Sequence, residues 1–107
     1  MIVPMYYVYL LRCADGSLYA GITTDLRRRY REHREGGNKG AKYTRAHPPA
    51  GYAGAWRAPD RAAASRLEYR LKKLGHADKE AVVDSWLPGY AALRPEELRE
   101  AEGRRSW

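Results

Sequence analysis

The sequence predicts an α+β fold in which a small three-stranded, largely antiparallel sheet is flanked by helices. Three observations support this fold class. An aromatic and β-branched run near the N-terminus is followed by a turn signal and a second run of the same kind. A third apolar run appears only after a segment with helical spacing, and a longer helical segment follows it. At 107 residues, the chain has the length of one domain with one core.

The first two strands are expected to form a hairpin. Residues 5–12 (MYYVYLLR) contain no breaker and are apolar on both faces, which indicates a central strand. Residues 13–17 (CADGS) predict a turn, and residues 18–22 (LYAGI) predict a second, shorter strand.

The length of this turn decides where two tyrosines point. A two-residue turn would place Tyr9 and Tyr19 on opposite faces of the sheet. A three-residue loop at 14–16, with Gly16 in the left-handed conformation, would pair Leu11 with Tyr19 and put both tyrosines on one face. The sequence permits either turn. We predict the three-residue loop, because only that form makes the two tyrosines part of a single site.

A helix is predicted over residues 26–35, after a capping signal at 23–25 and before a stop at Gly36. It carries an apolar pair and a polar pair, and the members of each pair are one turn apart. The polar pair is Arg29 and His33. Farther along we expect, in order, a basic loop over 36–50, a strand over 52–57, a helix over 59–74, a shorter helix over 78–86 and a helical turn over 95–102.

The chain is expected to divide into one domain and a tail. Residues 87–89 (LPG) break the shorter helix, and the sequence beyond them is mostly polar. We therefore assign residues 1–87 to the domain and residues 88–107 to a polar C-terminal tail that is partly helical or disordered.

Charge and cysteine content narrow the choice of partner and compartment. Lysine and arginine total 20 against 13 acidic residues, a formal net charge of +7. This excess favours a polyanionic partner, of which nucleic acid, either DNA or RNA, is the commonest. A basic surface that only keeps the protein soluble is the alternative.

The single cysteine, Cys13, excludes an internal disulfide and fits a reducing cytosol, so we expect a cytoplasmic protein. No run reaches the length of a membrane span, so no membrane is expected as a partner, and the sequence leaves a protein partner open.

Glu68 is a candidate metal ligand. It falls within an apolar stripe formed by Ala64, Leu67 and Leu71, where a carboxylate is costly unless it is paired or binds a cation. The alternative is a glutamate at the edge of the stripe, paired with a neighbouring lysine or arginine.

Two basic segments are candidates for contacts with phosphate. Arg29 and His33 could clamp a phosphate and move a proton, or they could belong to a solvated basic helix face. The basic loop predicts a surface that follows a nucleic-acid backbone and stacks on a base, although a hydrophilic loop is the alternative. The loop residues concerned are Lys39, Lys42, Tyr43 and Arg45.

The order of these residues resembles the GIY-YIG endonuclease family. The residues that carry the resemblance are Tyr7-Val8-Tyr9, Tyr19-Ala20-Gly21, Asp25-Leu26-x-x-Arg29-Tyr30-x-x-His33 and Leu67-Glu68. It extends from about Tyr6 to Leu74, and Tyr7 and Ala20 stand at motif positions that vary within the family. In detail the chain is similar to small stand-alone bacterial members (YLLRCADGSLYAGITTDLRRR, then GAKYTR), which resemble the nuclease domain of the Slx1 structure-specific endonucleases.

The resemblance implies metal-dependent hydrolysis of phosphodiester bonds in DNA, with one divalent cation, Mg²⁺ or Mn²⁺, held by Glu68. Tyr9 and Tyr19 match the two motif tyrosines, Arg29 matches the family arginine, and His33 matches a position that is often polar or histidine. These five residues form the expected catalytic set.

Their expected roles follow from chemistry. Arg29 would neutralise charge on the phosphate, because its planar fork suits the non-bridging oxygens. Tyr9 would deprotonate the attacking water while Tyr19 orients water or phosphate, or the two tyrosines would have the reverse roles. His33 would relay a proton to Tyr9 or contact the phosphate. The resemblance also suggests selectivity for DNA structure and a role in DNA repair or processing. A non-catalytic nucleic-acid-binding module on the same scaffold is the alternative function.

Overall fold

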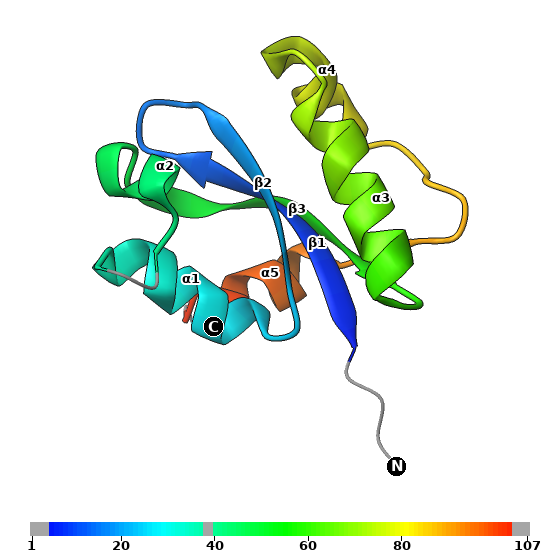
Figure 1. Cartoon of the computed structure of the whole chain (residues 1–107), viewed down its shortest axis with the longest axis horizontal. Coiled ribbons are helices and arrows are strands. Elements are labelled where there is room, and N and C mark those ends of the chain that lie inside the picture. Colours follow the sequence, from blue (N-terminus) through cyan, green and yellow to red (C-terminus); the bar gives the residue numbers. More distant parts are fainter. Residues whose placement is uncertain (1–4, 38–39, 104–107) are drawn as a thin grey trace.

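The computed structural model describes residues 5–37 and 40–103. Its strands form one antiparallel sheet in the order β2-β1-β3-β4, and helices cover both faces (Figure 1). The α+β class is therefore confirmed. The elements are β1 (Tyr6–Cys13), β2 (Leu18–Thr23), α1 (Leu26–Glu35), α2 (Lys42–Ala46), β3 (Pro49–Ala58), α3 (Arg61–Lys72), α4 (His76–Val82), β4 (Ala91–Ala92) and α5 (Pro95–Ala101).

The sheet has four strands, and the prediction of three was wrong in this respect. The fourth strand, β4, is two residues long and pairs with Trp56 and Arg57 at the outer edge of β3. Two residues show no periodicity, so the sequence could not reveal this strand. It lies within the segment expected to be a polar tail. Residues 88–103 thus add a strand to the sheet and a helix, α5, that packs against β3 and α1.

The segment expected to be a basic loop also contains regular structure. Its middle forms the five-residue helix α2, and its end already belongs to β3. The helix has no side-chain N-cap, because its cap residue is Ala41. The sequence therefore lacked the usual start signal for a helix here.

The sheet separates two apolar clusters. Val8, Leu10 and Trp56 pack against α3 on one face. Tyr9, Leu11 and Tyr52 pack on the other face, together with Leu26 and Tyr30 of α1 and Leu98 of α5. Figure 1 shows α3 on one side of the sheet and α1 with α5 on the other. The alternation of side chains along β1 thus supplies both clusters, which confirms that β1 is a central strand.

The hairpin turn has the three-residue form that we predicted. Leu11 pairs with Tyr19, and Tyr9 pairs with Gly21. Gly16 has a φ of 87°, and its amide donates to the Cys13 carbonyl at 2.9 Å. This left-handed position is one that glycine adopts without strain. Because both tyrosines belong to one face of the hairpin, they can contribute to the same site.

Aspartates begin the two helices that border the hairpin. Asp25 accepts a hydrogen bond from the Arg28 amide at 3.0 Å and caps α1. Asp60 accepts from the Ala63 amide at 2.8 Å and caps α3. These caps satisfy amides that have no partner within the helix and fix where each helix starts relative to the sheet.

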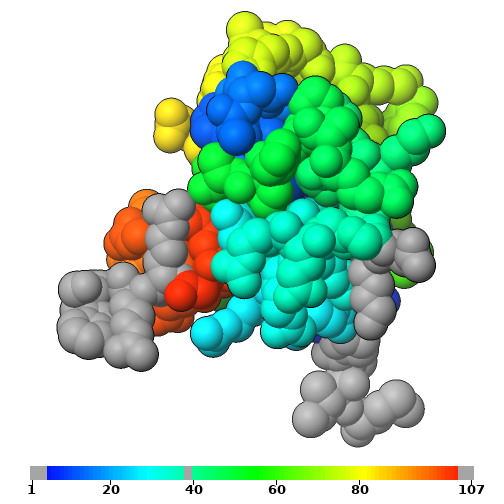
Figure 2. Space-filling view, turned by 90° about the vertical axis from the view of Figure 1, so that its left-hand side faces the viewer, coloured from blue at the N-terminus to red at the C-terminus, as the bar shows by residue number. Residues whose placement is uncertain are grey.

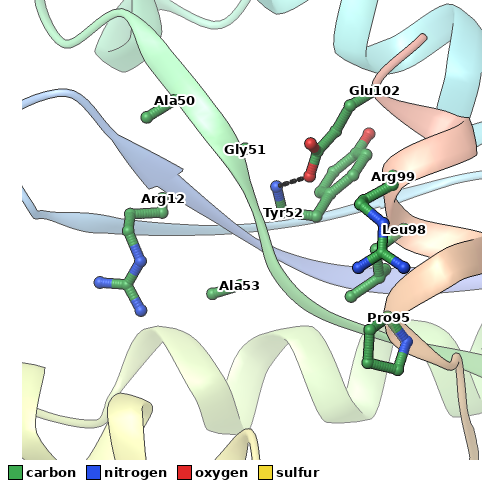
Figure 3. Close-up of a pocket in the computed structure, with 9 residues that line it drawn as sticks. All are labelled: Arg12, Ala50, Gly51, Tyr52, Ala53, Pro95, Leu98, Arg99 and Glu102. Atoms are coloured by element: carbon green, nitrogen blue, oxygen red, sulfur yellow. Dashed lines mark hydrogen bonds between the residues drawn. The ribbon is translucent and has the colours of Figure 1, made fainter. Parts of the chain in front are cut away.

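The C-terminal helix is anchored through Glu102. One carboxylate oxygen of this buried residue, Oε2, accepts from the Tyr52 amide at 2.7 Å, so it binds a β3 amide that no strand covers (Figure 3). Beside this contact lies a pocket of about 410 Å³ between β3 and α5, with Arg12 and Arg99 in its wall. Arg12 forms a two-pronged ion pair with Glu80 of α4. None of the five expected catalytic residues lines this pocket.

Membrane insertion through a helix finds no support in the described ranges. Within residues 5–37 and 40–103, no helix has the length and apolar composition that crossing a bilayer requires.

Replacing Glu102 with alanine is expected to lower the free energy of unfolding by about 1–3 kcal/mol, because the buried Tyr52 amide loses its partner. Glu100→Ala, at an exposed position of the same helix, serves as the control and should change it by about 0.5 kcal/mol or less. Urea unfolding of the two variants measures the difference. Equal stabilities would show that Glu102 does not anchor α5.

Candidate active site

The hydroxyl of Tyr9 lies between two side chains of α1. The residue is 1% exposed, and its hydroxyl is 2.7 Å from His33 Nε2. Arg29 donates to the same oxygen through Nε at 3.4 Å, which is a long hydrogen bond. Arg29 and His33 are one turn apart on α1, so both can reach a single atom on the neighbouring strand.

Thr44 determines which nitrogen of His33 carries the proton. The Thr44 hydroxyl donates to the Ala41 carbonyl at 3.1 Å, so its oxygen is left to accept from His33 Nδ1 at 2.8 Å. A neutral imidazole protonated at Nδ1 has a lone pair at Nε2. The Tyr9 hydroxyl therefore donates to His33, and its own oxygen accepts from Arg29.

Burial sets the protonation states of this pair. Burial raises the pKa of Tyr9 to about 12, even though the hydrogen bond and charge of Arg29 act in the opposite direction. Burial also lowers the pKa of His33 to about 4, and the Arg29 charge adds to this effect. At neutral pH the phenol is therefore protonated and the imidazole is neutral, which agrees with the direction of the hydrogen bond between them.

Arg29 is held in place and reaches a hollow at the surface. Its Nη1 pairs with Glu32 at 2.9 Å, and 22% of its side chain is exposed. The hollow has a volume of about 350 Å³, and Arg28 and Arg61 also line it. Three guanidinium groups from α1 and α3 thus border a space large enough for a phosphate group.

Gly21 makes room for the Tyr9 side chain. A Cβ atom at position 21 would overlap the hydroxyl and Cζ of Tyr9, although the backbone there is ordinary for a strand. The glycine is therefore required by space and not by its φ angle. It lets the phenol of Tyr9 lie over β2, where the hydroxyl meets α1.

Tyr19 belongs to an aromatic column that ties the hairpin to α2. Its ring is edge-on to His33, with ring centroids 5.6 Å apart, and it stacks on Tyr43 at 5.5 Å. Tyr43 in turn stacks on His47 at 4.1 Å. His47 Nδ1 lies 2.7 Å from an Asp15 carboxylate oxygen in the hairpin turn. The short helix α2 therefore positions Tyr19 through Tyr43 and His33 through Thr44.

Glu68 lies at the edge of this arrangement. Its side chain is 23% exposed and forms an ion pair with Lys72 at 3.6 Å. Lys72 lies over the Tyr19 ring, with Nζ 5.9 Å from the centroid. The Glu68 charge contributes a smaller upward shift to the pKa of Tyr9, so the two groups are within electrostatic reach. Within residues 5–37 and 40–103, the Glu68 carboxylate accepts no hydrogen bond.

The Glu68 carboxylate could contribute oxygen ligands to a single hard cation. A partly buried carboxylate with one distant ion pair has oxygen lone pairs to offer, and oxygen is the donor that Mg²⁺ and Mn²⁺ prefer. The described residues contain no group of three or more acidic, histidine or cysteine side chains that could hold a metal. Any cation at Glu68 would therefore take its other ligands from water and phosphate oxygens.

Similarity to known proteins identifies the family of this domain. The profile described as "GIY-YIG catalytic domain" matches residues 5–81, which is most of the chain. The chain belongs to the GIY-YIG family. GIY-YIG is a nuclease superfamily, and a nuclease domain implies a nucleic-acid substrate.

Small bacterial proteins of the UPF0213 group share this domain. A UPF0213 protein of Xanthomonas axonopodis pv. citri is 51% identical over 74 residues, covering 69% of this chain and 71% of the relative. UPF0213 protein YhbQ of Salmonella typhimurium is 49% identical over 78 residues, covering 73% and 76%. A solution NMR structure of a UPF0213 protein from Bacillus halodurans is 40% identical, covers 94% of this chain and 99% of its own, and has a TM-score of 0.49.

Within the GIY-YIG domain, the expected catalytic residues differ in how closely they meet. Tyr9, Arg29 and His33 are in direct contact, and Tyr19 packs against His33. The Glu68 charge reaches Tyr9, but among the described residues no hydrogen bond or ion pair joins Glu68 to the other four.

The expected nucleic-acid-binding residues belong to the segment that was predicted to be a basic loop, and they differ in exposure. Lys42 and Arg45 are exposed on α2, whereas the Tyr43 ring already stacks on two aromatic neighbours. Lys39 lies outside the described residues.

Thr44 is the site residue that sequence reasoning missed. It is 2% exposed, although it belongs to a segment predicted to be a solvated loop. A threonine between a tyrosine and an arginine gives no signal of burial. Recognising it would have required the helix α2 and its packing against α1.

Gly21→Ala is expected to displace the Tyr9 hydroxyl and lower the free energy of unfolding by about 1–3 kcal/mol, because the added methyl group enters a filled core. Gly75→Ala is the matched control, since a Cβ there meets no atom within 4 Å. Urea unfolding compares the two. A Gly21→Ala protein as stable as the control would mean that the Tyr9 side chain lies elsewhere.

Protonation of His33 is expected to destabilise the fold in acid. Because its pKa is lowered from 6.5 to about 4, the unfolded chain binds more protons than the folded one between these values. The stability that the neutral His33 ring contributes is complete above about pH 6.5 and is lost as the pH falls toward 4. The free energy of unfolding then falls by up to about 1.4 kcal/mol per pH unit. Urea midpoints measured across this range should fall more steeply for the wild type than for His33→Gln. Parallel curves would contradict a buried neutral imidazole.

Proposed function

We propose that the protein is a divalent-metal-dependent endonuclease that hydrolyses phosphodiester bonds in DNA. The observation that carries the proposal is the Tyr9 hydroxyl, which is held between the Arg29 guanidinium and the neutral His33 imidazole. Membership of a nuclease superfamily supports the reaction class. Selectivity for DNA structure and a role in DNA repair or processing complete the proposal.

Arg29 binds the scissile phosphate in this proposal. Its guanidinium is partly exposed at a basic hollow, and its pairing with Glu32 restricts the rotamers it can adopt. A preorganised charge stabilises the pentavalent phosphate without having to move during the reaction. Arg28 and Arg61 line the same hollow and add positive potential around the phosphate.

Tyr9 and His33 handle the proton of the attacking water. The water oxygen forms a bond to phosphorus, its proton goes to the Tyr9 oxygen, and the Tyr9 proton moves along the existing hydrogen bond to His33 Nε2. The bond from phosphorus to the leaving oxygen then breaks, its electron pair stays on that oxygen, and a solvent water gives the oxygen a proton. The pKa values of the two groups keep the proton on Tyr9 in the free protein, so the transfer depends on the charge of the bound substrate.

Thr44 and Tyr19 act as positioning residues in this scheme. Thr44 keeps His33 Nδ1 protonated, so that Nε2 remains the acceptor. Tyr19, stacked on Tyr43, directs its hydroxyl by the packing of its ring and would orient water or phosphate. Lys42 and Arg45, both exposed on α2, would contact the DNA backbone beside the site.

Glu68 would hold the cation, which is Mg²⁺ or Mn²⁺ in this proposal. A divalent ion bound there would supply Lewis acidity, which would polarise the phosphate and stabilise the leaving oxygen. The ion pair between Glu68 and Lys72 is long, at 3.6 Å, and solvent-exposed on the lysine side, so it is weak enough for a divalent ion to replace.

Cleavage of branched, nicked and single-stranded DNA with Mg²⁺ or Mn²⁺ tests this function. The wild type is expected to cut at least one of these substrates. Arg29→Ala, Glu68→Ala and Tyr9→Phe should each lower the rate by about 100-fold or more, because each removes one group that acts in the transition state. Tyr69→Phe is the control for Tyr9→Phe, since this exposed tyrosine lies on α3 and should tolerate the loss of its hydroxyl.

Substitutions at Thr44 separate its positioning role from simple packing. Thr44→Val keeps the shape but removes the hydroxyl, so activity should fall, whereas Thr44→Ser should retain most of it. Full activity in Arg29→Ala or Glu68→Ala would refute the mechanism. Salt-sensitive DNA binding without metal-dependent cleavage by the wild type would select the non-catalytic binding module instead.

A further inference from the structure

Helix α1 carries a second set of arginines that the proposed active site does not use. Arg27, Arg31 and Arg34 are all exposed. We refer to these three residues as the outer arginine row. In the described part of the chain, none of their side chains forms a hydrogen bond or an ion pair with another residue.

The row lies on the flank of α1 opposite the catalytic flank. At about 100° per residue, its three members are roughly 140–160° around the helix from Arg29. Successive members rise by about 6 Å and 4.5 Å along the axis, so the row is a line of charge about 10 Å long. One helix therefore presents guanidinium groups on two flanks, and a buried stripe containing His33 lies between them.

Acidic side chains near α1 do not neutralise the row. Glu32 pairs with Arg28 and Arg29 on the catalytic flank. On the neighbouring helix α5, Glu97 pairs with Arg57 and Arg94, and the Glu102 carboxylate binds the Tyr52 amide. The acids that remain near the row without an ion pair in the described part are Asp25, Glu35 and Glu100, all of them exposed.

The row borders a shaped surface. Its three arginines line a hollow of about 250 Å³ together with Tyr30 of α1 and residues 101–103. Glu102 is one of these residues, and its carboxylate already binds the Tyr52 amide. Figure 2 shows α1 (cyan) and α5 (orange to red) side by side on this face of the molecule. Arginines that only maintain solubility need no concave wall, whereas a hollow with three planar, unpaired guanidinium groups matches the oxygens of phosphates.

We propose that the outer arginine row is a second binding surface for the phosphate backbone of the DNA that the active site cleaves. This inference rests on the proposed function. The DNA passes over α1, so that one segment meets Arg29 and another meets the row. The row then makes backbone contacts that carry no sequence information and fix how the substrate lies on the protein.

The salt dependence of binding tests this surface. The triple variant Arg27→Gln, Arg31→Gln, Arg34→Gln is compared with the control Arg66→Gln, Arg70→Gln, Lys79→Gln, whose residues are exposed on α3 and α4. Both lower the net charge by three. Binding of labelled duplexes of increasing length is measured by fluorescence anisotropy over a range of salt concentrations, with divalent ions chelated so that the DNA stays intact. Circular dichroism verifies that both variants are folded.

The row variant should lower the slope of log K against log salt by about 2–3 on long duplexes, because each released phosphate contact contributes about 0.9. The control should leave the slope nearly unchanged. Equal slopes for the two variants on long DNA would overturn the proposal. A second result would also overturn the proposal. If inorganic phosphate binds saturably, if only the row variant loses this binding, and if the loss explains the whole effect on DNA binding, then the row is a site for small anions.

The binding surface and the proposed nuclease function can each fail without the other. A row-dependent slope in a wild-type protein that never cleaves DNA would support the surface and refute the nuclease. Metal-dependent cleavage with equal slopes would support the nuclease and refute the surface.

Discussion

The hydrogen bond from the Tyr9 hydroxyl to His33 Nε2 is the interaction on which the site depends. It joins the central strand to α1 inside the protein, at a point where both partners are almost completely buried. It forms only because each partner is held in one state. Burial keeps Tyr9 protonated and His33 neutral, and Thr44 leaves the lone pair of His33 on the nitrogen that faces Tyr9.

Several features of the fold serve this one contact. The left-handed Gly16 sets the hairpin register that puts Tyr9 opposite Gly21, and the missing side chain of Gly21 leaves room for the phenol. The cap at Asp25 fixes the start of α1, so that Arg29 and His33 reach the same oxygen. Helix α2 completes the site, because its Tyr43 stacks on Tyr19 and its Thr44 hydroxyl accepts a hydrogen bond from His33. The site is therefore a product of register, capping and one short helix.

The sequence was informative where patterns are local. The hairpin, the first helix and the turn length followed from Gly16, from the capping aspartate and from the requirement that two tyrosines share a face. The sequence did not reveal β4, because two alanines have no periodicity, or α2, because Ala41 provides no capping signal. Thr44 could not be found for the same reason. Its role depends on a long-range contact with His33, and a sequence shows no such contact without a family or a structure to supply it.

The protonation state of His33 tests the central claim most directly. Nitrogen NMR of the histidine side chains, with His33 assigned by comparison with His33→Gln, reports which ring nitrogen carries the proton and at what pH the ring titrates. We expect a neutral ring at pH 7 with the proton on Nδ1 and a pKa close to 4. A proton on Nε2, or titration near the ordinary value of about 6.5, would show that Tyr9 does not donate to His33 and would contradict the account.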